Sequence, residues 1–218
     1  MQISRLFQKS VVSISMVLAS VAANAAMITF DSLEQPGCGV VSCFTNMASY
    51  SEAGFTFTSN FTDDLAFASA MQGTTGVWYA GSAGLFNNYG AFGGVTTLTM
   101  DGGGPFDVLS IDLAPLSTHF PGPYTAGPTT VSFIGNIHGS GTVTQSFTTL
   151  SSLAFSNFTF SGFTNLDSLV WSQDSPWHQF DNVSVTASIP EPETYAMLLA
   201  GLGLLGFAAR RRKLKTAA

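Results

Sequence analysis

The sequence predicts an all-β fold, a two-sheet β-sandwich of the jelly-roll kind, flanked by an N-terminal signal helix and a C-terminal transmembrane helix. The middle of the chain is rich in Gly, Ser, Thr, Phe, Asn and Ala and contains few of the charged residues that favour helices. Thr, Phe and Val favour half-buried pleated surfaces, whereas Gly and Asn favour turns. This region also divides into about ten short runs separated by turn residues, with no internal repeat.

Alternation of apolar and polar residues is clearest at 106–113 and 131–137, which we interpret as strands. Residues 101–105 and 138–141 are rich in Gly and are expected to be hairpin links. Many short strands without an amphipathic helix favour a sandwich over a solenoid or a propeller. The expected strands are 28–30, 54–58, 76–80, 95–100, 106–113, 129–137, 142–150, 155–160, 166–172 and 180–187.

Charge is distributed unevenly along the chain. All seven Lys and Arg residues lie near the two ends, and the stretch from Ala26 to Ile189 has none of them but eleven acidic residues. A domain of this sign repels phosphate backbones, so nucleic acid is excluded as a partner. Metal ions are the obvious source of counter-charge, because the stretch has no cationic side chain to pair with its carboxylates.

Residues 1–25 have the order of a cleavable secretion signal. Arg5 and Lys9 form a positive front, Val11–Ala22 is mostly apolar, and small residues at 23–25 suit a cleavage site. An uncleaved membrane anchor is the alternative, but the apolar run is short and interrupted by Ser. The sequence therefore predicts export.

The carboxyl end has three parts in a fixed order: a Pro-Glu-Pro motif, the apolar run 195–209 and a basic cluster. As a helix, the apolar run would span about 22 Å, somewhat short of a hydrocarbon core of about 30 Å, and local thinning can absorb that difference. Basic residues tend to stay on the cytoplasmic side, which places the β-domain outside. The motif is Pro190, Glu191 and Pro192, and the cluster is Arg210, Arg211, Arg212 and Lys213.

This order resembles the PEP-CTERM sorting signal, a segment also labelled the ice-binding protein C-terminal domain. The resemblance covers 189–213 and implies that an exosortase-like membrane transpeptidase recognises the Pro-Glu-Pro motif, cleaves near it and treats the chain as its substrate. An ordinary tail anchor with a chance Pro-Glu-Pro is the alternative. The chain then divides into a signal (1–25), a β-sandwich domain (26–188), the sorting segment (189–213) and a short tail (214–218).

Cys38 and Cys43 are the only cysteines. In an exported protein, two cysteines this close in a loop are expected to form a disulfide. A metal pair is the rival reading, but no other thiol is present and the histidines are scattered. A redox role is disfavoured because the C-x-x-C spacing is absent.

No catalytic pattern stands out, and the domain is predicted not to be an enzyme. His119, His138 and His178 form no linked motif, and Glu34 and Glu52 are the only glutamates in the domain. Glycoside hydrolysis requires two carboxylates held about 5–10 Å apart, which the sequence does not identify. No Lys or Arg is available to stabilise a developing oxyanion.

Two Phe-Asp pairs, Phe30-Asp31 and Phe180-Asp181, occur in the first and last expected strands. They resemble carbohydrate-binding-module-like jelly rolls, in which these strands lie together and nearby carboxylates hold a structural calcium ion. Calcium prefers six to eight oxygen ligands, and Asp31, Glu34 and Asp181 are the candidates. The alternative is that these acidic residues belong to turns on a solvated rim.

Aromatic residues in turn-rich segments are candidates for ligand binding, because a sugar ring stacks its apolar face on Trp or Tyr. The candidates are Trp78, Tyr124 and Trp177, of which Trp177 follows a turn-like Asp-Ser-Pro. Trp171 lies in an expected strand and is assigned to the core. The alternative for the whole set is that aromatic residues fill the inner sheet faces.

The sequence therefore indicates an exported, exosortase-sorted cell-surface or extracellular-matrix protein that binds exopolysaccharide and is not an enzyme. A matrix or adhesive protein acting through protein contacts is the first alternative, and a polysaccharide-active hydrolase is the second. Ice binding is disfavoured, because the Thr-x-Thr triples are isolated in the sequence and no repeat aligns them.

Overall fold

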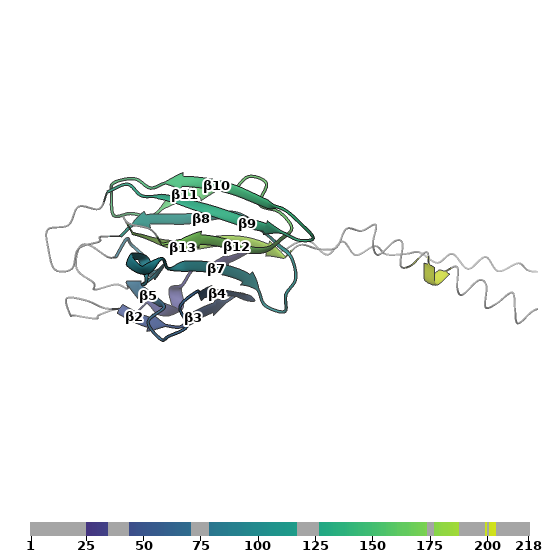
Figure 1. Cartoon of the computed structure of the whole chain (residues 1–218), viewed down its shortest axis with the longest axis horizontal. Helices are drawn as coiled ribbons and strands as arrows, with labels where there is room; N and C mark the ends of the chain where they lie inside the picture. Colours follow the sequence, from purple (N-terminus) through teal and green to yellow (C-terminus); the bar gives the residue numbers. More distant parts are fainter. Residues whose placement is uncertain are drawn as a thin grey trace, which may run out of the picture.

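The computed structural model describes residues 25–34, 44–70, 79–116, 127–173, 177–187, 199 and 201–203. Thirteen antiparallel strands and two short 3-10 turns, η1 (Asp31–Leu33) and η2 (Gly90–Phe92), make up this part of the chain (Figure 1). The expected all-β architecture is confirmed.

Six strands form one sheet, which we call sheet I. The order across it is β3 (Ser49–Glu52), β4 (Phe55–Ser59), β7 (Val95–Met100), β12 (Leu166–Ser172), β9 (Thr130–Ile137) and β10 (Thr142–Thr148).

The other strands form sheet II. Its order is β2 (Phe44–Met47), β5 (Phe67–Ala70), β6 (Gly84–Asn87), β13 (His178–Ala187), β8 (Phe106–Pro115) and β11 (Ser156–Thr159), and β1 (Ala25–Ile28) pairs with the second half of β13. A single residue pair, Phe106 with Leu166, joins the two sheets. From β7 onward the chain passes repeatedly from one sheet to the other, as in a jelly roll.

The core lies between the two sheets and is dominated by aromatic rings. Phe57 of sheet I packs against Phe180 of sheet II with ring centroids 5.5 Å apart, and Trp171 meets the same Phe180 edge-on at 5.0 Å. All three side chains are buried, which confirms the assignment of Trp171 to the core. Burying side chains of this size contributes roughly 1.5–3 kcal/mol each, so the inward-facing Phe residues stabilise the sandwich.

The first and last strands lie side by side, as expected. Ile28 of β1 pairs with Val183 of β13, and the chain then turns at Phe30, whose φ of 53° is in the left-handed region. Glu52 of β3 fixes this turn, because its Oε2 accepts hydrogen bonds from the Phe30 amide at 3.1 Å and from the Tyr50 hydroxyl at 2.8 Å. One carboxylate thus ties the amino-terminal strand of sheet II to the edge of sheet I.

The outer face of sheet I is covered by short hydroxyl side chains. Because side chains alternate along each strand, the residues flanking buried Phe57 and Leu98 all point outward. Strand register aligns the Thr-x-Thr segments that appear isolated in the sequence: Thr56 pairs with Thr99 and Thr58 with Thr97. Hydrogen-bonded side-chain pairs join neighbouring strands, namely Ser51–Thr56, Ser132–Ser146, Thr130–Thr148 and Asn136–Ser168. These hydroxyls keep an exposed sheet polar in a domain without Lys or Arg.

Two sequence expectations about connections and strands are corrected. The link at 101–105 is not a hairpin, since β7 and β8 belong to different sheets. Asp101 instead binds the β3–β4 hairpin, through its amide to Gly54 O at 2.8 Å and its carboxylate to Thr56 Oγ1 at 2.6 Å. Tyr79 and Ala80 are not in a strand, because a bend with φ of 117° at Gly81 follows them directly. The link at 138–141 does join two paired strands, β9 and β10, as predicted.

Most of the two terminal segments lies outside the described residues. This includes residues 1–24 of the expected signal, while Ala25 is the first residue of β1. Within 195–209, Leu199 and residues 201–203 are helical and exposed. None of the helices in the described ranges has the length and apolar character needed to cross a membrane.

Candidate functional site

Aromatic residues gather at one end of the domain, around η2. Phe61, which follows β4, stacks on Tyr89 with ring centroids 4.1 Å apart and an interplanar angle of 15°. Phe92 meets Tyr89 edge-on at 6.2 Å and is 74% exposed, more than any other large apolar side chain that the structure describes. A group of rings at the surface, rather than in the core, is the feature that sugar-binding faces share.

Trp177 lies directly beside this group. A Cβ atom placed on Gly90 would come within 2.6 Å of the Trp177 indole Nε1, so the ring rests against the backbone of η2. On its other side the indole packs against a small buried cluster that includes Phe86 and Leu116. Trp177 is therefore partly buried, with its position set by the chain beneath it. We call Phe61, Tyr89, Phe92 and Trp177 the aromatic patch.

Three partly buried hydrogen bonds hold Phe61 and Tyr89 in place. Asn87, at the end of β6, accepts a hydrogen bond from the Tyr89 amide at 3.0 Å and donates one to Ser59 Oγ at 3.0 Å. The same Ser59 oxygen accepts the Phe61 amide at 3.1 Å. Gly94 is needed nearby, since a Cβ there would lie 2.2 Å from Asn87 Oδ1. The stacked pair is thus fixed by backbone anchors before any ligand arrives.

Asn60 clamps the far side of the η2 turn. Its side-chain amide donates to Gly93 O at 3.1 Å, and its Oδ1 accepts the Val95 amide at 2.7 Å. Gln173, buried after β12, supports the same turn, because its backbone amide donates to Gly94 O at 2.8 Å. These contacts connect η2 to both β4 and β12.

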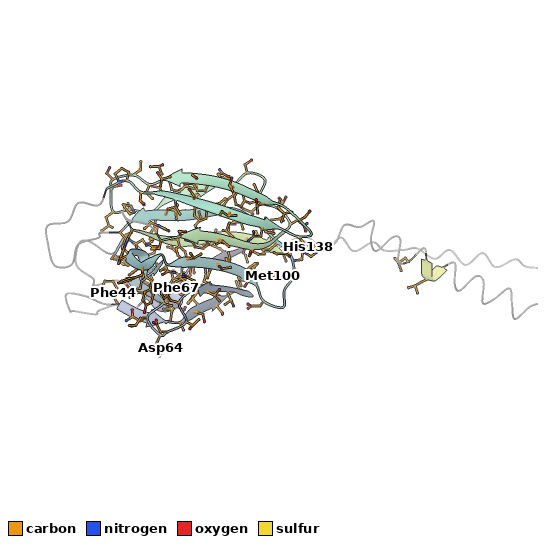
Figure 2. The ribbon with its side chains drawn as sticks, viewed as in Figure 1. Phe44, Asp64, Phe67, Met100 and His138 are labelled. Atoms are coloured by element: carbon orange, nitrogen blue, oxygen red, sulfur yellow. The ribbon has the colours of Figure 1, made fainter. Side chains whose placement is uncertain are left out.

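Acidic residues border the aromatic patch. The Asp63 carboxylate accepts hydrogen bonds from the Tyr89 hydroxyl and, at 3.0 Å, from the Leu65 amide. The hydrogen bond to Asp63 raises the pKa of Tyr89, because the phenol donates to a negative group. Asp64, next in the chain, is exposed and lies at the lower edge of the domain (Figure 2). The patch therefore combines rings with negative charge.

The three predicted calcium ligands differ in their surroundings. Asp31 is exposed in η1, whereas Asp181 is buried in β13. Glu34 accepts a hydrogen bond from the Tyr79 hydroxyl at 3.0 Å, and Tyr79 also donates to Gly81 O at 2.9 Å. In the described part of the chain, no three His, Cys, Asp or Glu side chains converge closely enough to hold a metal ion. Calcium binding stays a prediction.

Asp181 is surrounded by hydrogen-bond donors rather than by cations. Its carboxylate accepts hydrogen bonds from Ser82 Oγ and, at 2.7 Å, from the Asn182 amide. The Asn182 side chain also donates to Asp112 Oδ2 at 2.9 Å, so it bridges two carboxylates on paired strands. Burial, together with the negative charges of Asp112 and Asp31, raises the pKa of Asp181 to about 6.

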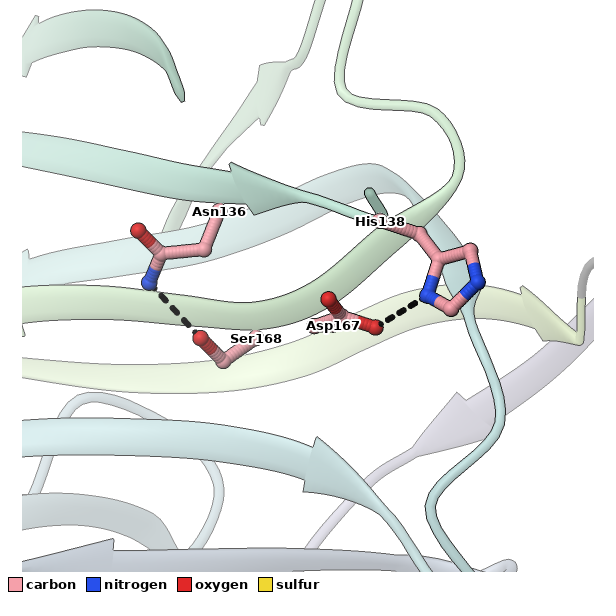
Figure 3. Close-up of polar contacts among 4 residues, drawn as sticks. All are labelled: Asn136, His138, Asp167 and Ser168. Atoms are coloured by element: carbon pink, nitrogen blue, oxygen red, sulfur yellow. Dashed lines mark hydrogen bonds and ion pairs between the residues drawn. The ribbon is translucent and has the colours of Figure 1, made fainter. Parts of the chain in front are cut away.

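The two described histidines have different surroundings. His138 Nδ1 lies 2.7 Å from Asp167 Oδ1 in an exposed contact beside the Asn136–Ser168 hydrogen bond (Figure 3). His178 is buried at the start of β13, and burial lowers its pKa to about 3. His119 lies outside the described residues.

Several predicted site residues also lie outside the described residues. They are Cys38 and Cys43, Trp78, Tyr124, Pro190, Glu191 and Pro192, and Arg210, Arg211, Arg212 and Lys213. The disulfide and the two ligand-binding aromatics Trp78 and Tyr124 thus stay predictions.

Sequence reasoning identified Trp177 but missed Phe61, Tyr89 and Phe92. A signal was present, because residues 86–94 place three aromatic rings among Asn and Gly residues. Such turn-forming residues favour surface loops, where an aromatic side chain is not needed for the core. Phe61 had a similar signal, since it lies between Asn60 and the turn-forming Asp63 and Asp64, but its stacking on Tyr89 is visible only in the structure.

Comparison with known proteins gives one match in sequence and several in structure. No curated protein matches the chain. Among solved structures, a family 29 carbohydrate binding module has a TM-score of 0.40 at 9% identity, with 80% of this chain and 98% of the module covered. A mutant of such a module complexed with mannohexaose has a TM-score of 0.34 at 10% identity, covering 76% of this chain and 93% of that chain. In the tail, residues 188–213 match the PEP-CTERM protein-sorting motif.

Proposed function

We propose that the β-domain is a non-catalytic glycan-binding module that an exosortase-like enzyme sorts to the cell surface or the extracellular matrix. The observation that carries this proposal is the aromatic patch, in which the stacked pair Phe61 and Tyr89 lies beside Phe92, a ring that is 74% exposed. An exposed ring of this size leaves apolar surface in contact with water, and a ligand that covers the ring would bury that surface.

A sugar polymer suits this patch better than a compact apolar ligand does. The C–H faces of a pyranose stack on aromatic rings, while its hydroxyls need nearby polar partners. Asp63 and Asn60 lie next to the rings and supply acceptors and donors. A surface patch, unlike a closed pocket, also admits a long chain, which makes exopolysaccharide the expected ligand.

The sorting part of the proposal rests on the tail. The match at 188–213 contains the Pro-Glu-Pro motif and the basic cluster, the two features that an exosortase-like transpeptidase would recognise and retain. We infer that the chain is exported, held in the inner membrane through the carboxy-terminal segment, and released to the surface after cleavage. This partner acts on the tail, whereas the glycan meets the β-domain.

Binding of the full-length chain to the producing cell's exopolysaccharide and to a glycan array tests the proposal. Phe92→Ala is expected to weaken binding about fivefold or more, because a flat ligand stacked on one aromatic ring gains about 1–3 kcal/mol, as measured for nucleic-acid bases. The matched control is Leu150→Ala, which removes an apolar side chain that is 62% exposed in the β10–β11 connection.

Other outcomes of that experiment identify the alternatives. Self-association without glycan binding would indicate a matrix or adhesive protein that acts through protein contacts. Release of free sugars would indicate a hydrolase. Equal loss of binding in Phe92→Ala and Leu150→Ala would overturn the assignment of the site.

A further inference from the structure

We infer that the aromatic patch selects glycans that carry free amino groups, such as polymers of glucosamine, over N-acetylated and acidic glycans. This inference rests on the proposed glycan-binding function and adds the chemical class of its ligand. It follows from the contact of the Asp63 carboxylate with Tyr89, from the exposed Asp64 next to it in the chain, and from the charge of the whole domain.

The turn that carries Phe61 also carries Asp63 and Asp64. Asp63 is held against the ring pair by its contact with the Tyr89 hydroxyl, so one negative charge lies at the rim of the stacked rings. Asp64 is exposed and makes no hydrogen bond or ion pair with the residues that the structure describes. Asp63 therefore positions the rings, and Asp64 is available to a ligand.

An ammonium group gains from both features of this surface. Near an aromatic face, a cation is attracted by the ring quadrupole, worth about 0.5–1 kcal/mol at exposed sites. A nearby exposed carboxylate adds about 0.2–1 kcal/mol. An N-acetyl group is neutral and gains neither term, while a uronate is repelled by both carboxylates.

The charge of the domain acts in the same direction. Between Ala26 and Ile189 there are eleven acidic residues and no Lys or Arg, so no side chain of this stretch is permanently positive. The summed field attracts cationic polymers over roughly 8 Å at physiological ionic strength. An acidic polysaccharide would meet repulsion at every approach.

Several other carboxylates of the domain are engaged by protein donors. Asp107 accepts the Asn165 amide at 2.7 Å, and Asp112 accepts the side chains of Asn157 at 2.7 Å and Asn182 at 2.9 Å. The Asp63–Asp64 turn differs because Asp63 contacts the aromatic patch through Tyr89 and the exposed Asp64 follows Asp63 directly in the chain. Because acidic and aromatic residues meet at this turn, we assign the selectivity for amino groups to the aromatic patch.

Binding of the full-length chain to three oligosaccharides tests the inference: glucosamine, N-acetylglucosamine and galacturonic acid oligomers of equal length, at a pH where the amine is protonated. The glucosamine oligomer is expected to bind most tightly. Asp64→Asn is expected to weaken its binding about two- to fivefold and to leave the N-acetylated oligomer unaffected. High salt should weaken the glucosamine complex alone.

Asp167→Asn is the matched control. It removes the same charge from an exposed residue that lies beside His138, at a different part of the domain from Asp64 (Figures 2 and 3). Its binding to all three oligosaccharides should equal that of the unaltered chain.

Three results would overturn the inference, and the first two separate it from the proposed function. If Phe92→Ala abolishes binding but the N-acetylated oligomer binds as tightly as the glucosamine oligomer, the glycan site stands and the selectivity is wrong. If Asp64→Asn and Asp167→Asn weaken binding equally, the effect comes from net charge and not from this turn. If no sugar binds at all, the proposed function fails and this inference with it.

Discussion

The backbone of Gly90 and the indole of Trp177 are in direct contact, so that a Cβ on Gly90 would lie 2.6 Å from Trp177 Nε1 and 2.8 Å from Cε2. This contact connects η2, which carries Phe92, to the start of β13. A residue without a side chain thereby sets the spacing between two parts of the aromatic patch.

Gly90→Ala is therefore expected to move Trp177 or η2 and to weaken glycan binding severalfold without removing any ring. A shift in the Trp177 fluorescence maximum should accompany the loss, because the indole leaves its present surroundings. Ala91→Ser, at the exposed neighbouring position, is the control and should change neither quantity. Unaltered fluorescence and affinity in Gly90→Ala would contradict the packing described here.

Truncation of Phe57 and truncation of Phe92 should change the free energy of unfolding by very different amounts. Phe57 is buried among Phe30, Trp171 and Phe180, so Phe57→Ala is expected to lower the free energy of unfolding by about 3–5 kcal/mol. Phe92→Ala removes an exposed ring and should change stability by less than about 0.5 kcal/mol. Urea unfolding measures both. A large loss of stability in Phe92→Ala would show that the ring belongs to the core.

Glu52→Gln should destabilise the domain, because the carboxylate accepts hydrogen bonds from Thr29, Phe30 and Tyr50. A glutamine amide would direct N–H groups at one of these donors, which costs about 1–3 kcal/mol. Ser51→Ala, on the exposed hydroxyl face, is the control. The account would be contradicted if the two variants had equal thermal stability.

Asp181 and His178 should have opposing effects on stability between about pH 4 and pH 6. The pKa of Asp181 is raised from 3.8 to about 6, so the folded state holds a proton that the unfolded state has lost, and stability falls as pH rises. The pKa of His178 is lowered from 6.5 to about 3, so the unfolded state holds the extra proton, and stability rises with pH. The two slopes oppose each other in the unaltered chain.

When either side chain is replaced, the pH dependence of the free energy of unfolding should show the effect of the one that remains. With rising pH, the free energy of unfolding of Asp181→Asn should increase relative to that of the unaltered chain, and that of His178→Phe should decrease. Each difference should amount to at most about 1.4 kcal/mol per pH unit. Urea unfolding at several pH values in this window measures both slopes. Parallel curves for all three proteins would show that neither group has the shifted pKa.

The structural calcium predicted at Asp31, Glu34 and Asp181 has a direct test. If calcium binds there, it should raise the melting temperature of the full-length chain, and Asp31→Asn should abolish that rise. A melting temperature that does not respond to calcium or to a chelator, in either protein, would remove the ion from this account.

Strands with one buried face were the most predictable part of the fold. Residues 95–100 and 166–172 were assigned with their observed bounds, because apolar and polar side chains alternate along them or nearly so. β6 was missed, since all four of its residues are buried and no alternation exists. β2, β3 and β5, each of four residues, were also missed.

Features that depend on pairing between distant strands were not predictable from the sequence. The Thr-x-Thr segments at 56–58 and 97–99 become neighbours only through the β4–β7 register. Similarly, Tyr89 and Phe61 lie 28 positions apart in the sequence. The hydrogen bond between Asn87 and Ser59 brings together the segments that carry them. Trp177 was identified because its turn-like Asp-Ser-Pro neighbours are a local signal.

Hydrogen–deuterium exchange of the full-length chain, with and without saturating exopolysaccharide, tests the central claim most directly, because it locates the ligand without altering any side chain. The account predicts slower exchange at residues 61–65 and 88–94, the two segments that carry the exposed rings and the acidic turn. Saturable binding with protection elsewhere, for example on the hydroxyl face of sheet I, would contradict the aromatic patch as the glycan site.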